Sequence, residues 1–179
     1  MKIFWSLGLL AVTGANSNDT CENKWVIREI CEGRKDFNSL TSHDKNTVST
    51  VLFAEMVMYR DLQTEIDKND FRKDLENRIN CLSRTKSLLN YENMGLRLTP
   101  LMFAAKHYIP FSKVKRIASK SNVNHTNIYG ENALHIMLKH HFAPITHNHD
   151  LEFNVTKLLV RNGIDLTQMT NSDSSTGSF

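Results

Sequence analysis

Apolar residues recur at helical spacing along most of the chain, and little of the sequence alternates as a β-strand does. Three stretches each carry one apolar face. We expect a helix over residues 22–32, a second that Asp44 or Asn46 caps, and a third that begins at Asn69 or Asp70. The predicted buried stripes are Trp25, Val26, Ile30 and Cys31, then Val48, Val51, Leu52, Met56 and Tyr59, then Phe71, Leu75, Ile79, Leu82 and Leu89. The pattern predicts an all-α fold.

The second half of the chain repeats itself. The tetrapeptide Thr-Pro-Leu-Met at 99–102 recurs 33 residues later as Asn-Ala-Leu-His at 132–135. Thr99 and Asn132 each offer a side-chain oxygen that can cap a helix, and Pro100 suits the first helical position because its missing N–H needs no partner there. A second helix is predicted after each start, with the apolar stripes Phe111, Val114, Ile117 and Ala118, and Val155, Leu158 and Leu159.

These segments resemble ankyrin repeats. The stretch "NVNHTNIYGENALHIM" at 122–137 is similar to an ankyrin finger loop and the start of its first helix, and "VTKLLVRNGIDL" at 155–166 is similar to the second helix with its glycine end. The resemblance implies a structural hydrogen-bonding role for His135. Gly130 at the finger turn and Gly163 at the helix end are candidates for a positive φ angle.

The predicted organisation is a short ankyrin-type helical repeat solenoid preceded by an N-terminal helical segment. The resemblance spans about two repeats, 98–166, within a repeat region that we place at 91–170. Repeats bury their apolar faces only against neighbours, so we expect residues 18–90 to cap the array, as diverged repeats or as an unrelated helical bundle. The second repeat carries a His-rich insertion at about 140–153, and 171–179 is typical of a flexible tail.

The last repeat has no obvious cover in the sequence. Terminal repeats of such arrays need polar outer faces. Here we expect Leu158, Leu159 and Ile164 to be partly exposed. Such exposure predicts self-association, binding of a partner, or a truncated array.

The resemblance also implies a binding surface. Ankyrin repeats bind other proteins along their fingers and first helices, and we expect the same use here, with the partner unidentified. The positions carried over are Asn127, Tyr129 and Glu131 in the finger, and Phe103, Lys106, Ile136 and Lys139 on the first helices. Their mixture of polar and aromatic side chains suits a binding surface and suits a plain solvent face equally well.

The N-terminus has the parts of an export signal. Lys2 precedes an apolar run over 3–12, and small residues lead to a predicted cleavage after Ser17. The alternative is that this run forms a buried first helix of a cytosolic protein. A polar stretch begins directly afterwards, which favours a signal peptide over 1–17 and a secreted protein.

Three sequons would become glycosylation sites in the secretory pathway. They are Asn18, Asn124 and Asn154. A glycan on Asn124, in the finger, would obstruct the surface that ankyrin proteins use for partners. Export and finger binding are therefore compatible only if Asn124 is unmodified or the binding face lies elsewhere.

The chain has three cysteines, an odd number that cannot pair completely within one molecule. Ten residues of continuous helix would hold Cys21 and Cys31 about 15 Å apart, beyond disulfide reach. In an exported protein, Cys81 with one of the other two is the expected bridge. In a cytosolic protein, all three would be ordinary thiols.

Composition excludes some classes of partner. The net charge of +3 is small, and the basic stretch "KVKRIASK" at 113–120 alternates with apolar residues, which favours the wet face of a helix over an anion-binding patch. We therefore expect no nucleic-acid partner. No stretch after the N-terminal run reaches the ~20 apolar residues that span a bilayer, so we expect no membrane insertion.

Motifs of the common enzyme classes are absent from the sequence, including G-x-S-x-G, the P-loop, G-x-G-x-x-G and H-E-x-x-H. We expect neither enzymatic activity nor a cofactor. The histidines of the insertion, His140, His141, His147 and His149, lie near Asp150, but no helix-spaced pair or thiolate supports a metal site. A solvated loop is expected there instead.

Together these patterns predict a non-enzymatic protein–protein interaction module that is exported. One alternative is a cytosolic ankyrin adaptor or regulator, such as a viral or parasite-type mimic of host ankyrin proteins. Another is a secreted toxin-like effector, because latrotoxins also place a helical region before ankyrin repeats. A membrane-active segment would favour the toxin, and the mature sequence shows none.

Overall fold

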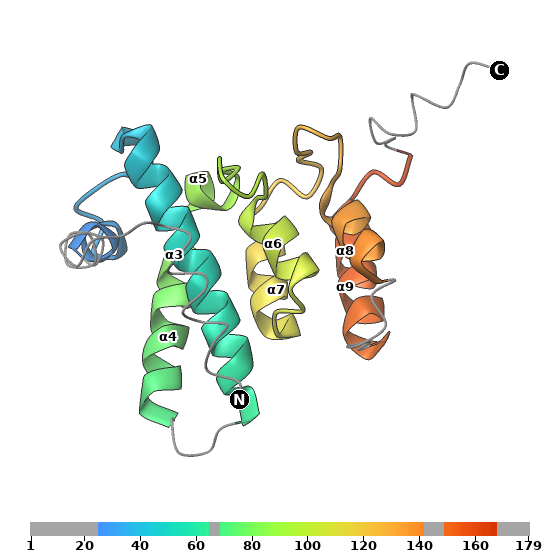
Figure 1. Cartoon of the computed structure of the whole chain (residues 1–179), viewed down its shortest axis with the longest axis horizontal. Helices are drawn as coiled ribbons and strands as arrows, with labels where there is room; N and C mark the ends of the chain where they lie inside the picture. The colour runs from blue at the N-terminus through green and yellow to red at the C-terminus, as the bar shows by residue number, and fades with distance from the viewer. Residues whose placement is uncertain (1–24, 65–68, 142–148, 168–179) are drawn as a thin grey trace. The chain divides into compact units, whose positions relative to one another are not determined.

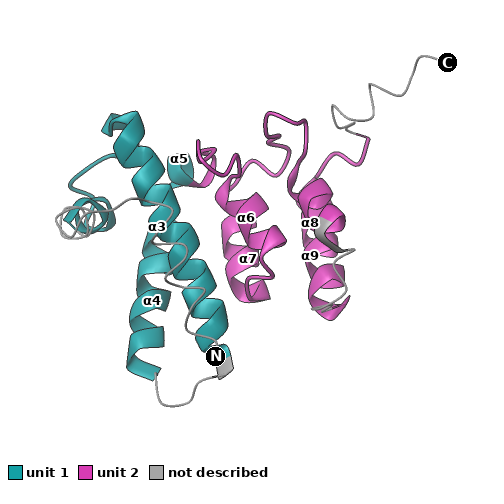
Figure 2. Ribbon diagram, viewed as in Figure 1, with its two compact units in different colours: residues 1–88 teal, residues 89–179 magenta. Residues whose placement is uncertain are grey.

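The chain folds into helices joined by short loops. A computed structural model describes residues 25–64, 69–141 and 149–167, and these residues contain no β-strand beyond one isolated bridge between Asn93 and Leu98. The predicted all-α class is therefore confirmed. The chain divides into two compact units, residues 1–88 and 89–179 (Figure 2).

Unit 1 consists of a short helix and a long helical hairpin. Its elements are a helix over 25–31, η1 (Phe37–Ser39), α3 (Ser42–Asp61), η2 (Leu62–Thr64), α4 (Asn69–Leu82) and α5 (Lys86–Leu89), the last at the border with unit 2. Figure 1 shows α3 and α4 side by side, and the two helices pack against each other. The first helix ends before Gly33, which has a φ of 71°.

The start of α3 differs from the prediction. Thr41 is the cap: its Oγ1 accepts a hydrogen bond from the Asp44 N–H at 3.1 Å and donates one to the Asp44 carboxylate at 2.8 Å. The assignment of the cap to Asp44 or Asn46 was therefore wrong. Asp44 lies in the first turn, where a carboxylate is favourable beside the positive end of the helix dipole.

Most of the predicted stripe residues of α3 and α4 form the core of unit 1. Val51 is half-buried, and the fully covered members are Val48, Leu52, Met56, Tyr59, Leu75, Ile79 and Leu82. Phe71 is exposed because it lies in the first turn of α4, at the end of the packed region. α4 stops at Leu82, so Leu89 is buried as part of α5 instead of extending the α4 stripe.

The helix over 25–31 turns a different side inward from the one predicted. Val26, Ile27 and Ile30 are buried, whereas Trp25 and Cys31 are exposed. Ile27 points about 160° away from Trp25 on a helical wheel, so burying Ile27 leaves the indole in solvent.

A disulfide joins this helix to α4. It links Cys31 and Cys81, whose Cα atoms lie 5.6 Å apart and which are separated by 50 residues in sequence. This is one of the two pairings that the sequence left open. Cys21 lies outside the described residues.

A buried ion pair also connects α3 with α4. Glu55 is 7 % exposed, and its Oε1 accepts a hydrogen bond from Arg78 Nε at 2.5 Å. Arg78 also pairs with exposed Asp74 one turn away. Burial raises the pKa of the Glu55 carboxyl, and the hydrogen bond from Arg78 opposes that rise without cancelling it.

Unit 2 contains two helix pairs. They are α6 (Pro100–Lys106) with α7 (Phe111–Ala118), and α8 (Ala133–His141) with α9 (His149–Arg161). α6 packs against α7 and α8, and α9 packs against α7 and α8. Figure 1 shows the pairs standing beside each other, with first helix next to first helix and second next to second.

The two first helices begin with the same reciprocal cap. The Met102 N–H donates to Thr99 Oγ1 at 3.4 Å, while the Thr99 N–H contacts Met102 Sδ at 3.5 Å. In α8, the N–H groups of Leu134 and His135 donate to Asn132 Oδ1 at 3.0 and 3.1 Å, and the Asn132 N–H donates to His135 Nδ1 at 3.3 Å. Both predicted caps and the structural role of His135 are confirmed.

The end of the array is covered differently from the prediction. Leu159 and Ile164 are fully buried rather than partly exposed, and Leu158 is half-buried. The cause is the turn after α9, where Gly163 has a φ of 80°, as predicted, and the Ile164 N–H donates back to the Leu159 carbonyl at 3.1 Å. This turn folds Ile164 onto the helix.

Candidate protein-interaction surface

A loop before α6, residues 93–98, is closed by one asparagine. We call it finger 1. Asn93 Oδ1 accepts hydrogen bonds from the N–H groups of Gly95 and Leu96, both at 3.0 Å. The Asn93 N–H donates to the Leu98 carbonyl at 3.0 Å, and Asn93 itself is buried. The loop backbone is thus fixed from inside by the side chain at its base.

The loop before α8, residues 127–131, is built in the same way. We call it finger 2. Asn127 Oδ1 accepts from the N–H groups of Tyr129 and Glu131 at 2.9 and 3.0 Å. The Asn127 N–H donates to the Glu131 carbonyl at 3.0 Å. The two fingers are therefore equivalent parts of a repeated unit, with one more residue in finger 1.

Each finger has one residue in the left-handed region. Arg97 has a φ of 55° and Gly130 a φ of 75°, and they stand 33 residues apart. The Arg97 N–H donates to the Asn93 carbonyl at 2.7 Å, and the Gly130 N–H donates to the Asn127 carbonyl at 3.0 Å. The positive φ predicted for Gly130 is confirmed, and finger 1 puts a strained arginine in the matching place.

The tips of both fingers are apolar and exposed. The exposed fractions are 55 % for Met94, 45 % for Leu96, 52 % for Ile128 and 57 % for Tyr129. We call these four residues the fingertip patch. Both loops extend from the same end of unit 2 (Figure 1). Exposed apolar side chains gathered on neighbouring loops are typical of interaction sites.

The fingers are also linked at their bases. Asn90 Oδ1 accepts a hydrogen bond from the Asn122 N–H at 2.6 Å. Glu92 lies between two basic side chains, with His125 Nε2 at 3.6 Å and Arg97 Nη1 at 4.0 Å. These contacts hold the segment before finger 1 beside the segment before finger 2.

The seven residues predicted to bind a partner fall into two groups. Tyr129 and Lys139 are exposed and Lys106 is half-buried. The other four, Phe103, Asn127, Glu131 and Ile136, are buried within unit 2 and offer a partner little surface. Sequence reasoning missed Met94, Leu96 and Ile128, although counting one repeat back from Asn127 leads close to Asn93 and its two apolar neighbours.

The buried polar members of finger 2 hold the loop itself. Glu131 accepts hydrogen bonds from Asn127 Nδ2 at 3.0 Å and from Lys139 Nζ at 2.8 Å. Burial would raise the pKa of the Glu131 carboxyl, but these two hydrogen bonds outweigh burial and the pKa lies below its ordinary value. Lys139 thereby ties finger 2 to α8.

The sequons lie in three different settings. Asn124 is exposed, but its Oδ1 accepts from the Asp165 N–H at 2.6 Å and its Nδ2 donates to the Gly163 carbonyl at 2.9 Å. Asn154 is exposed on α9, and Asn18 lies outside the described residues, as does the predicted signal peptide.

No known protein family, curated protein or solved structure matches this chain. Within the described residues, no three His, Cys, Asp or Glu side chains lie close enough together to hold a metal ion. The side chains of His140 and His141, and residue His147, are outside that set. None of the described helices is both long and apolar enough to cross a membrane.

Proposed function

We propose that unit 2 is a pair of ankyrin-type repeats that binds another protein through the fingertip patch, in an exported chain without enzymatic activity. The repeated features support this proposal. Each repeat has a reciprocally capped first helix, a second helix packed beside it, and an asparagine-closed finger. The order finger, helix, helix is that of an ankyrin repeat.

The exposure of the fingertip patch carries the binding proposal. Met94, Leu96, Ile128 and Tyr129 contribute little to the core, because about half of each side chain is in water. Their loops are nevertheless fixed by hydrogen bonds from buried asparagines. A surface that is already ordered loses less conformational entropy on binding, so a rigid apolar tip favours association.

The Cys31–Cys81 disulfide supports export. Structural disulfides persist in the secretory pathway and outside the cell, whereas cytosolic thiols are kept reduced. The bridge joins two helices of unit 1 across 50 residues, as structural disulfides of secreted proteins do. A cytosolic adaptor would have to form the same contact with two free thiols.

The binding test uses photo-crosslinking at the patch. A photoreactive amino acid replaces Tyr129 in the full chain, which is then incubated with host-cell medium and, separately, with cell lysate. We expect a defined adduct that is lost when Leu96→Ser and Ile128→Ser are added. A pattern that the two serine substitutions leave unchanged would contradict binding through the fingertips.

The matched control changes an exposed apolar residue elsewhere. Phe71 is 45 % exposed on α4 of unit 1, close to the exposure of Leu96. Phe71→Ser should leave the adduct at Tyr129 unchanged. Equal loss with both variants would mean that general surface apolarity, and not the fingers, causes the crosslink.

The export test compares medium and lysate of a eukaryotic culture that expresses the full chain. We expect protein in the medium that starts at Asn18, and a Cys31–Cys81 peptide in a non-reducing digest. An intact Met1 in the cytosol with both thiols free would favour the cytosolic adaptor. Lysis of cells by the purified protein would favour the toxin-like effector.

A further inference from the structure

The outer face of the last helix pair exposes positions that are covered in the pair before it. Ala105 of α6 and Leu138 of α8 occupy the same place, 33 residues apart, counted from the caps Thr99 and Asn132. Ala105 is 4 % exposed, whereas Leu138 is 49 % exposed. α8 packs on α6, and the matching side of α8 is open to solvent.

The second helices show the same difference. Ile117 and Leu159 are equivalent, because both are fully buried and both carbonyls accept from the N–H three residues later at 3.1 Å. The next residues along are Ala118, at 2 % exposure, and Val160, at 47 %. The side of α7 that lies beside α9 is therefore covered, and the same side of α9 is not.

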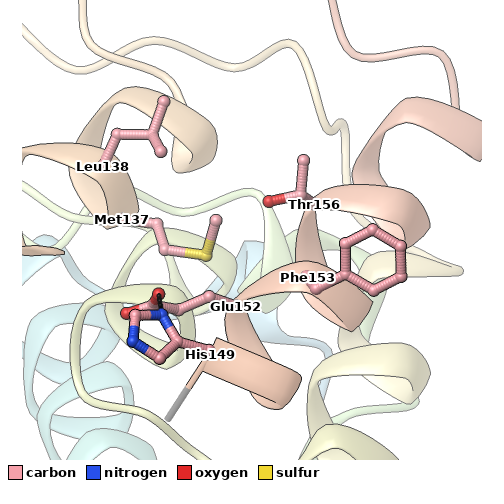
Figure 3. Close-up of a pocket in the computed structure, with 6 residues that line it drawn as sticks. All are labelled: Met137, Leu138, His149, Glu152, Phe153 and Thr156. Carbon is pink, nitrogen blue, oxygen red and sulfur yellow. Dashed lines mark ion pairs between the residues drawn. The ribbon is translucent and has the colours of Figure 1, made fainter. Parts of the chain in front are cut away.

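We define the end face as Leu138, Phe153, Thr156, Val160 and Leu166. Phe153, Thr156 and Val160 follow one stripe of α9, at steps of three and four residues. A hollow of about 330 Å³ lies on this side, and Figure 3 shows the residues of α8 and α9 that line it, Leu138, Phe153 and Thr156 among them. The end face thus has apolar ridges and a recess.

Charged residues flank the α9 stripe in an order that fits self-pairing. Asp150 lies in the first turn and Arg161 in the last, both exposed. The eleven residues between them make three helical turns, so the two charges lie on the same edge of α9, roughly 16 Å apart. Lys157 is exposed along the same edge.

We propose that two copies of this chain associate through their end faces around a two-fold axis, with the two α9 helices antiparallel. This arrangement places Asp150 of each copy opposite Arg161 of the other and sets the helix dipoles against each other. It also covers Leu138 and Val160 with a helix pair of the same kind that covers Ala105 and Ala118 within the chain. A parallel arrangement would place acid opposite acid.

The test is sedimentation velocity of the purified full chain over a concentration series. We expect a concentration-dependent dimer whose dissociation constant rises at least about tenfold in Val160→Asp, because a buried charge at an interface centre costs about 2 kcal/mol or more. Ile128→Asp on finger 2 is the matched control and should leave the dimer unchanged. A monomer at every wild-type concentration overturns the proposal.

Charge reversal tests the two-fold geometry separately and uses only exposed positions, so it remains decisive if Val160→Asp misfolds. Asp150→Arg and Arg161→Asp should each weaken the dimer, since each creates two like-charge contacts. An equal mixture of the two variants should restore it, because every contact then joins opposite charges. A mixture no tighter than either variant alone overturns the antiparallel arrangement. Since the fingertip patch is not involved, binding through the fingers can fail without affecting this result.

Discussion

Asn124 and Asp165 are joined across the two helical repeats, with the Asp165 N–H donating to Asn124 Oδ1 at 2.6 Å. One repeat earlier, the Asn122 N–H donates to Asn90 Oδ1 at the same distance. Each asparagine thus holds the loop of the following repeat. The side chain of an exposed sequon residue is part of the fold.

Asn124→Ala should lower the free energy of unfolding by about 1–2 kcal/mol, because it removes two hydrogen bonds that each contribute about 1 kcal/mol. The measurement is urea unfolding of protein made without glycosylation. Thr126→Ala abolishes the same sequon without touching the Asn124 side chain and should cost much less. Equal losses in the two variants would contradict a structural role for Asn124.

Arg97 is the second place where the fold predicts a change in stability. Its φ of 55° costs a residue with a Cβ about 1 kcal/mol, and glycine avoids that cost. Arg97→Gly should therefore stabilise the protein by about 0.5–1 kcal/mol, and Gly130→Ala should destabilise it by a similar amount or more. Thermal unfolding followed by circular dichroism measures both.

Arg97→Ala is the control for this pair. It removes the same side chain, including the 4.0 Å contact with Glu92, while keeping a Cβ in the left-handed region. Surface contacts of that length contribute little, so this variant should unfold close to the wild type. If alanine stabilises as much as glycine, strain at Arg97 is not the cause.

The local caps could be predicted from sequence, and the burial of the fingers could not. Thr99 and Asn132 act on N–H groups two or three residues ahead, so the tetrapeptides contain the whole interaction. Glu131 is buried because Lys139 reaches it from the next helix, and no local pattern contains that contact. An ankyrin-like surface read from sequence therefore includes side chains that the fold has already used.

Finger 1 escaped prediction for a different physical reason. Its left-handed position holds Arg97 instead of glycine, and the loop is one residue longer than finger 2. The turn residue and the spacing that revealed finger 2 were both absent. The hydrogen bonds of Asn93 show the equivalence, because they depend on the backbone and not on the identity of the tip residues.

Glu131 should make finger 2 sensitive to acid. Its folded pKa lies below the ordinary value of about 4.3, so the ion pair stabilises the fold above that value and is lost as the pH falls through the folded pKa. Glu131→Gln should be less stable than the wild type at neutral pH and nearly equal to it in acid. Urea midpoints measured across this range decide the matter, and a pH-independent difference would contradict the prediction.

The disulfide predicts a large loss of stability on its removal. A bridge that closes a loop of 50 residues is worth about 4 kcal/mol by loop entropy, and measured losses commonly run from about 2 to 5 kcal/mol. The double variant Cys31→Ser/Cys81→Ser should unfold at a correspondingly lower urea concentration. Cys21→Ser leaves the bridge intact and is the control. A small effect of the double variant would mean that the bridge does not form in solution.

The Glu55–Arg78 pair should respond to pH in the opposite direction from Glu131. Burial raises the folded pKa of Glu55 above its unfolded value, so stability falls as the pH rises through that window. Arg78→Met leaves a buried carboxylate without its cation and should cost about 3 kcal/mol near neutral pH. The loss should shrink in acid, where Glu55 is protonated. The double variant Glu55→Gln/Arg78→Met should lose less than Arg78→Met alone at neutral pH, because no buried charge remains. Equal losses at both pH values in Arg78→Met would show that packing of the arginine, and not its charge, stabilises the α3–α4 hairpin.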